Sequence, residues 1–335
     1  MSQITNIRIT APEIASLWTQ YQNDSLAICV LKYLTAHTED KSIIELSKYT
    51  ITIAEKNIEF IKQELEREGY AIPRGFTNED VNISARKLFG DCFTLHYLNN
   101  MTRIGILAYG LSLSNASRED IRRFYVQSAT NSIEINEKVI KLMLEKGIYS
   151  RPPSIPPNKK VRFAEKQGFL GSIFKETRPL TVIEITNLFS NIQTNVIGKA
   201  VMTAFSQVAD SPEVRNYFIR GKEIANKHIN LFIDKLSQND LTGCLPLEPL
   251  LTDSTQAPFS DKLMMFHTAA LVQAGVANYG AAISTSQRYD LAIDYSRLMV
   301  EVGAFAEDGA NIMIDKGWFE EPPQAVNRKE LAMSH

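Results

Sequence analysis

The 335-residue sequence contains only three cysteines, which are scattered singly along the chain at Cys29, Cys92 and Cys244. So few and so widely spaced cysteines predict neither a disulfide framework nor a zinc site, and each is expected to be a small buried apolar residue. The sequence also lacks any apolar run near the roughly 18 residues of a membrane span. Residues 1–10 lack the basic and apolar segments of a secretory signal. We therefore expect a cytoplasmic protein with no membrane span.

An excess of either charge is missing as well. The chain has 36 lysines and arginines against 38 acidic residues, which gives a formal net charge of -2. Proteins that bind nucleic acid favour a basic patch or stripe, so no nucleic-acid partner is expected. Neither a glycine-rich phosphate loop after a strand nor a nucleophile elbow is present. These absences favour a protein that is not an enzyme, although they leave the question open.

The sequence does contain a long internal repeat. A repeat of this length indicates the architecture of the chain, so the other patterns are assigned to its two halves. Phe89-Gly90-Asp91 and Tyr109-Gly110 recur, about 170 residues later, as Phe259-Ser260-Asp261 and Tyr279-Gly280. Thr10 and Glu13 recur in the same way as Thr181 and Glu184. One helical unit is therefore written twice in the chain.

Apolar residues at helical spacing predict four helices in each half. Thr10-Ala11-Pro12-Glu13 is a capping box with proline in the first turn, and it opens the first helix. In the first half the later helices are expected at about 41–68, from near Ser84 to about Ser112, and from a cap at Ser117-Arg118-Glu119-Asp120 to Lys146. In the second half the helices are expected to start at Thr181, at Ser211-Pro212, near Pro258 and near Ser286.

Prolines divide the chain between the two halves. We predict a first bundle over 1–150, a stiff Pro-rich linker over 151–177, a second bundle over 178–323 and a tail over 324–335. In each half a long loop joins the second and third helices while the other joins are short, and one long crossover is typical of ferritin-like connectivity. The predicted fold is therefore all-α, with two tandem ferritin-like four-helix bundles.

Five stretches of the sequence resemble a family from endospore-forming, Bacillus-type bacteria that is catalogued as a domain of unknown function. They are Ile72–Thr77, Ser117–Asp120, Arg178–Leu180, Pro258–Met265 and Gly317–Pro323. Together they extend over nearly the whole chain. The resemblance implies a ferritin-like fold and, through the spore-coat label that some members carry, an association with the spore. It implies no set of catalytic residues.

Ferritin-like carboxylate proteins bind two metal ions with a glutamate from each of two helices and a Glu-x-x-His motif from each of the other two. No histidine of this chain has a glutamate three residues before it: Leu34 precedes His37, Phe93 precedes His96, Ala225 precedes His228, and Met264 precedes His267. A dinuclear site is therefore not expected in either half.

A weaker metal-binding set remains in the second half. Glu184, His228, His267 and Glu301 come one from each helix, and together they could bind one Mn, Fe or Zn ion through nitrogen and oxygen. Their counterparts in the first half are Glu13, Asn57, Tyr97 and Asn131, which could not do so. Each residue also has a structural interpretation: Glu184 completes a capping box, the two histidines pack at the core boundary, and Glu301 faces solvent.

These patterns leave three hypotheses about function. The first is a non-catalytic structural or assembly protein that packs through its helix faces against other proteins or a second copy of itself, as a homo-oligomer. The second is a ferritin-like metal-binding protein or metal-dependent oxidoreductase that uses the second repeat, and no other cofactor is expected. The third is a small-molecule carrier whose pocket is lined by the helix that contains Met264 and His267.

Overall fold

The computed structural model describes residues 7–170 and 178–333. Three segments lie outside the described residues: 1–6, on which the expectation of no secretory signal partly rests; 171–177, in the predicted linker; and 334–335, in the predicted tail. The described residues form helices and loops, with two isolated β-bridges and no longer strand. The long helices are α1 (Ala11–Ala36), α2 (Lys41–Arg67), α3 (Asp91–Asn115), α4 (Glu119–Glu145), α5 (Val182–Val208), α6 (Pro212–Ser237), α7 (Asp261–Thr285) and α8 (Tyr289–Asp315). The short ones are α9 (Arg328–Met333) and the 3-10 turns η1 (Asn78–Asp80), η2 (Gln167–Leu170) and η3 (Glu248–Leu250).

The helices begin and end largely where local signals place them. The capping boxes of Thr10 with Glu13 and of Thr181 with Glu184 open α1 and α5, as predicted. Gly69, Gly147 and Gly317 follow α2, α4 and α8 in the left-handed conformation, with φ of 76°, 68° and 67°. Glycine adopts this conformation without steric cost, so it ends a helix cleanly.

Two predicted helix starts were wrong. The third helix begins at Asp91 rather than near Ser84, because the chain before it is held in extended pairing with a distant segment. The cap of α4 is Arg118 rather than Ser117. The carboxylate of Asp120, which the pattern assigned to a capping box, instead binds the Arg118 guanidinium.

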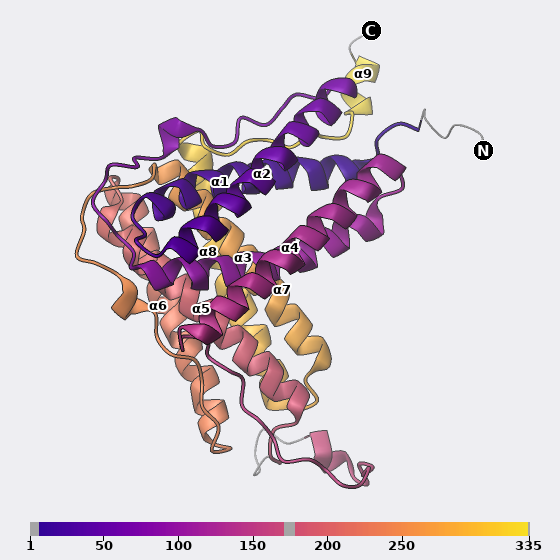
Figure 1. Cartoon of the computed structure of the whole chain (residues 1–335). Helices are drawn as coiled ribbons and strands as arrows, with labels where there is room; N and C mark the ends of the chain where they lie inside the picture. Colours follow the sequence, from indigo (N-terminus) through magenta and orange to yellow (C-terminus); the bar gives the residue numbers. More distant parts are fainter. Residues whose placement is uncertain (1–6, 171–177, 334–335) are drawn as a thin grey trace.

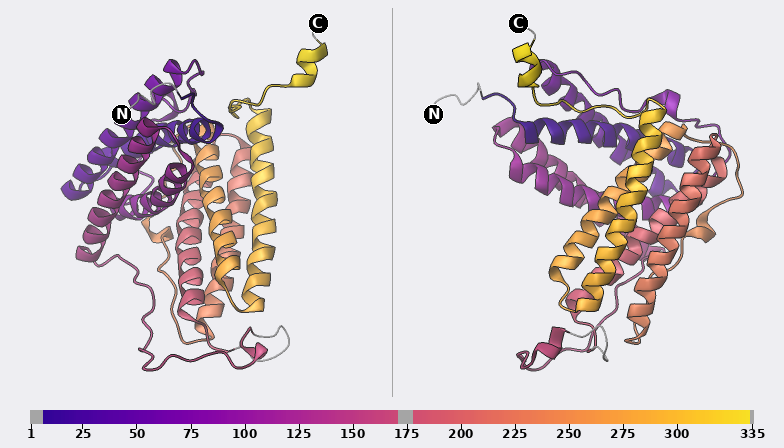
Figure 2. Two further views of the ribbon diagram at one scale, coloured as in Figure 1. Left: turned by 90° about the vertical axis from the view of Figure 1, so that its right-hand side faces the viewer. Right: turned by 180° about the vertical axis from the view of Figure 1, so that it is seen from behind.

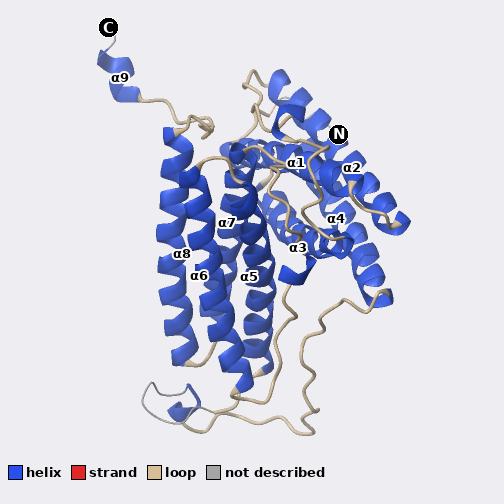
Figure 3. Cartoon of the chain, turned by 90° about the vertical axis from the view of Figure 1, so that its left-hand side faces the viewer, coloured by secondary structure: helices blue, strands red, loops and turns tan. Residues whose placement is uncertain are grey.

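In the described part of each repeat, four long helices pack as two antiparallel pairs. In the first repeat α1 packs on α2 and α3, and α4 packs on the same two helices; α5 to α8 follow the same pattern. The long connectors over 68–90 and 238–260 therefore join helices that lie diagonally across each repeat. Figure 2 shows α5 to α8 side by side, with the first repeat crossing one end of them, and Figure 3 shows the loop that follows α4 running along the outside.

The two long connectors pair with each other. Val81 bridges Phe259 and Phe89 bridges Leu251, both in the antiparallel sense. Leu251 lies one repeat offset, about 170 residues, after Val81, and Phe259 lies the same distance after Phe89. Each contact therefore occurs twice with its partners exchanged, as in the isologous interface of a two-fold symmetric dimer. Four hydrogen bonds obey the same exchange: Asn82 N to Pro258 O, Thr252 N to Leu88 O, Ser260 N to Asp80 O and Gly90 N to Leu250 O.

The main hydrophobic core runs through both repeats. It includes Leu31 and Leu98 from the first repeat and Phe205 and Met265 from the second, all of them buried. A second, smaller cluster around Leu17 and Tyr125 fills the far end of the first repeat. Figure 1 shows this end projecting away from the second repeat. The domain boundaries at 150, 177 and 323 stay predictions. No helix among the described residues is long and apolar enough to cross a membrane.

Candidate functional site

Glu184, the first of the predicted metal ligands, is fully buried at the start of α5. Its carboxylate accepts hydrogen bonds from the Arg178 guanidinium at 2.8 and 3.0 Å, from Thr181 N at 2.8 Å and Thr181 Oγ1 at 3.0 Å, and from Arg288 N at 3.0 Å. Burial opposes ionisation of this carboxyl, but the bonds from Arg178 and Thr181 outweigh it and hold the pKa of Glu184 below its usual value. These bonds use the accepting positions of the carboxylate and join the start of α5 to the start of α8.

Glu13 plays the same part in the first repeat. Its carboxylate accepts bonds from Thr10 N at 2.7 Å and from Ser117 N and Arg118 N, both at 2.8 Å, at the turn before α4. At the opposite end of each repeat, an aspartate at the start of the third helix binds the turn between the first two helices. Asp91 accepts the N–H of Glu39 at 2.9 Å, and Asp261 accepts the N–H of Ser211 at 2.9 Å. Each repeat is thus tied at both ends by a carboxylate that binds the turn of the other helix pair.

His228 and Glu301 are the two predicted ligands that the structure brings together. His228 Nε2 lies 3.1 Å from Glu301 Oε2, and His228 Nδ1 lies 2.8 Å from the Tyr279 hydroxyl. The Glu301 carboxylate also binds Lys227 Nζ at 2.8 and 3.0 Å. Burial lowers the pKa of His228, and the nearby Glu301 carboxylate partly offsets this by raising it. Glu301 is therefore a partly buried partner of a histidine and a lysine, rather than the solvent-facing residue of its structural interpretation.

His267 lies elsewhere. Its ring packs against Tyr97 of the first repeat and Phe205 of α5, with both ring centroids at 5.6 Å. Burial lowers its pKa to about 4, so the imidazole is neutral at neutral pH. Among the described residues no group of three or more His, Cys, Asp or Glu side chains is placed to hold a metal ion. Metal binding by the four residues therefore stays a prediction, with only His228 and Glu301 in contact.

The first repeat holds a second polar cluster that sequence reasoning missed. Asp24 of α1 is buried, accepts a hydrogen bond from Gln20 Nε2 at 3.3 Å, and lines a cavity of about 60 Å³ with Asn57, Tyr109 and Asn131. Burial raises the pKa of Asp24 to about 7, against the hydrogen bonds from Asn57 and Gln20. Asn57, Tyr109 and Asn131 are the repeat counterparts of His228, Tyr279 and Glu301. One signal was available: Asp24 lies on the helix face of the buried residues Leu17 and Tyr21.

Both repeats also bury an arginine just before their fourth helix. Arg118 binds the carboxylates of Glu64, Glu68 and Asp120, and Arg288 binds Asp290 through Nε at 3.0 Å and Nη2 at 2.8 Å. A charge removed from water is costly unless it is paired and hydrogen-bonded, and here the pairing is complete. The Arg-x-Asp pattern recurs in both repeats and marks the turn that Glu13 or Glu184 caps.

Comparison with known proteins gives one family and one structural neighbour. The model of the family described as protein of unknown function (DUF3231) matches the chain twice, over residues 2–161 and 168–331. A crystal structure from Bacillus halodurans, provisionally described as a spore coat protein, is similar at 19% identity with a TM-score of 0.41; the similarity covers 45% of this chain and 98% of that one. No curated protein matches the chain.

Proposed function

This chain belongs to the DUF3231 family of proteins of unknown function, and we propose that it is a non-catalytic structural or assembly protein. In this proposal it binds a second copy of itself through an exposed helix face. The observation that carries the proposal lies on α3. Leu107 and Leu111, one helical turn apart, are 69% and 67% exposed, and Ala108 and Gly110 between them are exposed too.

Two leucines at this spacing share one face of the helix. Exposed apolar residues that occur singly need no explanation, whereas a contiguous apolar patch marks an interaction surface. In α7 the corresponding positions hold Ala277 and Ala281. The exposed pair of large apolar side chains therefore belongs to the first repeat and not to the second, which supports a specific contact rather than a property of the repeated unit.

The buried charges are consistent with this proposal. Glu13, Glu184, Asp91 and Asp261 hold helix ends together through backbone N–H groups. A general acid or base must reach its substrate with a free lone pair or a proton. These carboxylates are instead committed to the fold.

Sedimentation velocity over a concentration series tests the proposal. The parent protein is expected to associate as its concentration rises, and the double variant Leu107→Glu with Leu111→Glu is expected to sediment as a single chain throughout. Placing two carboxylates on the face makes its burial unfavourable without changing the core. Val300→Glu, which alters a 72% exposed residue of α8, is the matched control and should associate like the parent. A parent that stays monomeric at every concentration would contradict the proposal.

Metal binding by the second repeat is the second candidate function. The observation that favours it is the contact between His228 and Glu301, since imidazole and carboxylate are ligands of Mn, Fe and Zn. A metal ion there would have to displace Lys227 from the carboxylate. Elemental analysis of untagged protein should give close to one equivalent of metal in the parent and much less in Glu301→Gln. Equal and negligible metal in both proteins would remove this candidate.

We also infer a ferritin-like arrangement of each repeat and an association with the spore. The long connector between diagonal helices supports the first inference, because ferritin-like folds have one such crossover. The second follows from the sequence resemblance to a family of endospore-forming bacteria. Detection of the protein in growing cells and its absence from purified spores would contradict it.

A further inference from the structure

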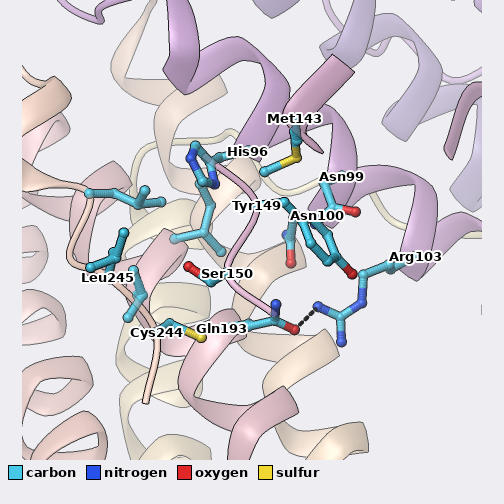
Figure 4. A pocket seen from close by; sticks show the side chains of 13 residues that line it. His96, Asn99, Asn100, Arg103, Met143, Tyr149, Ser150, Gln193, Cys244 and Leu245 are labelled. Atoms are coloured by element: carbon cyan, nitrogen blue, oxygen red, sulfur yellow. Dashed lines mark hydrogen bonds between the residues drawn. The ribbon is translucent and has the colours of Figure 1, made fainter. Parts of the chain in front are cut away.

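A small cavity lies where the first repeat meets the second. It has a volume of about 40 Å³ and is bounded by α3, by the segment after α4, by α5 and by the connector before α7. Its polar lining includes His96, Asn100, Arg103, Ser150 and Gln193. Figure 4 shows Arg103 and Gln193 meeting on one side of the cavity, His96 on the other, and Ser150 between them in this view. The cavity is too small for a drug-sized ligand, which needs roughly 300 Å³ or more.

Arg103 is partly buried and lacks the carboxylate partner that the two buried arginines have. Its Nη1 donates to Gln193 Oε1 at 2.8 Å, and no carboxylate in the described part of the chain lies within 4.0 Å of it. Guanidinium has five N–H donors, so most of them are left for another acceptor. Arg118 and Arg288, in contrast, are each bound by carboxylates. A partly buried cation without an anion is costly, and a bound anion would remove that cost.

The remaining polar groups around the cavity favour the same kind of ligand. Asn100 is 8% exposed, and neither its amide nor the Ser150 hydroxyl has a hydrogen-bond partner among the described residues. Burial lowers the pKa of His96 to about 4, so the neutral ring can donate one N–H at neutral pH. An amide, a hydroxyl and an imidazole can all donate to oxygen atoms placed next to the guanidinium.

The internal repeat relates this cavity to a second place in the chain, the twin position. At the twin position the chain supplies a carboxylate of its own. One repeat offset after Ser150 stands Glu320, whose carboxylate accepts the N–H groups of Arg74 at 2.8 Å and Gly75 at 2.9 Å. Arg74 and Gly75 are the counterparts of Cys244 and Leu245, which line the cavity. Phe266, the counterpart of His96, packs there on Phe76 with a ring-centroid distance of 5.2 Å. The twin position is therefore filled by an aromatic pair and a carboxylate.

We propose that the cavity around Arg103 binds a small oxyanion, of the carboxylate or phosphate class, in the place that Glu320 takes at the twin position. The anion would bridge α3 and α5, and so would stabilise the junction of the two repeats. Because His96, Arg103 and Ser150 are replaced by Phe266, Gln273 and Glu320 at the twin position, each chain has one such site.

The test measures the thermal unfolding of the full chain in sodium phosphate, sodium acetate and sodium chloride at equal ionic strength, together with calorimetric titration of phosphate and acetate. Phosphate or acetate should raise Tm saturably where chloride does not, since a ligand of the folded state stabilises it by mass action. The anion that gives the larger shift identifies the class. Arg103→Gln, which copies Gln273, should lose the effect, whereas Arg220→Gln, which alters an exposed arginine paired with Asp308, should keep it.

Ser150→Glu provides a second and opposite result. It copies Glu320, so it should raise Tm without added anion and should no longer respond to phosphate or acetate. This outcome remains informative if Arg103→Gln does not fold. Either of two results would overturn the proposal: no difference between the oxyanions and chloride in the parent protein, or an undiminished oxyanion response in Ser150→Glu.

Discussion

Asp24→Asn should make the protein more stable by ~4 kcal/mol at pH 8, because burial raises the pKa of this carboxyl from 3.8 to about 7 and each pKa unit is worth about 1.4 kcal/mol. The carboxyl titrates near pH 7 in the folded protein rather than near 3.8. It is buried without a cationic partner, so its charged form is disfavoured. Asparagine keeps an oxygen that can accept from Gln20, carries no charge, and is the residue at the counterpart position, Asn195.

The pH dependence has a definite sign. Between pH 3.8 and about 7 the unfolded chain has released this proton while the folded chain keeps it, so the free energy of unfolding falls as the pH rises. Above pH 7 the deficit is constant, and below pH 3.8 it vanishes. Denaturant unfolding of parent and variant at pH 4, 6 and 8 should show a difference that grows with pH. Asp308→Asn, at an exposed position, is the control. A constant difference across this range would contradict the assignment.

Glu184→Gln should destabilise the protein by about 3–5 kcal/mol, as expected when one partner of a buried ion pair is removed. The substitution leaves the Arg178 guanidinium without its carboxylate and places an amide against the N–H groups of Thr181 and Arg288. The substitution also distinguishes a helix-capping role of Glu184 from a role as a metal ligand. A structural carboxylate matters equally with and without a chelator, whereas a metal ligand would matter only when metal is present.

The loss should shrink in acid. The folded-state pKa of Glu184 lies below its usual value, so its stabilisation is present above the ordinary glutamate pKa and disappears as the pH falls through the folded-state value. Unfolding at pH 7 and pH 3, each with and without chelator, measures both effects. Glu301→Gln, at a partly exposed carboxylate, should cost less. A Glu184→Gln protein as stable as its parent would show that this carboxylate does not hold the helices together.

Local signals in the sequence predicted much of the fold. The capping boxes at Thr10 and Thr181 and the glycines after α2, α4 and α8 act within a few residues, so sequence alone places them. The pairing of Val81 with Phe259 was not predictable, since it depends on the docking of two segments far apart in the chain. The same docking displaced the predicted start of α3.

The functional residues were harder to predict than the fold. Glu184, His228, His267 and Glu301 were grouped because each helix of the second repeat supplies one, but they lie at different levels of the repeat. Glu184 is at the start of α5, His228 meets Tyr279 beside the middle of α5, and His267 packs against Phe205 near the end of α5. From the sequence alone, a single arginine such as Arg103 is expected to be exposed to solvent. Its lack of a carboxylate becomes meaningful only once α5 and the connector before α7 close over it.

The antiparallel pairing of the two connectors has a consequence for how this protein can diverge. In an assembly of two identical chains, any substitution near the two-fold axis appears at both related places, so neither place can change without the other. Here both partners belong to one polypeptide, and a substitution is made once. Ser150 can therefore leave an opening on one side of the axis while Glu320 closes the other. Joining the copies allowed the two halves to differ where they touch.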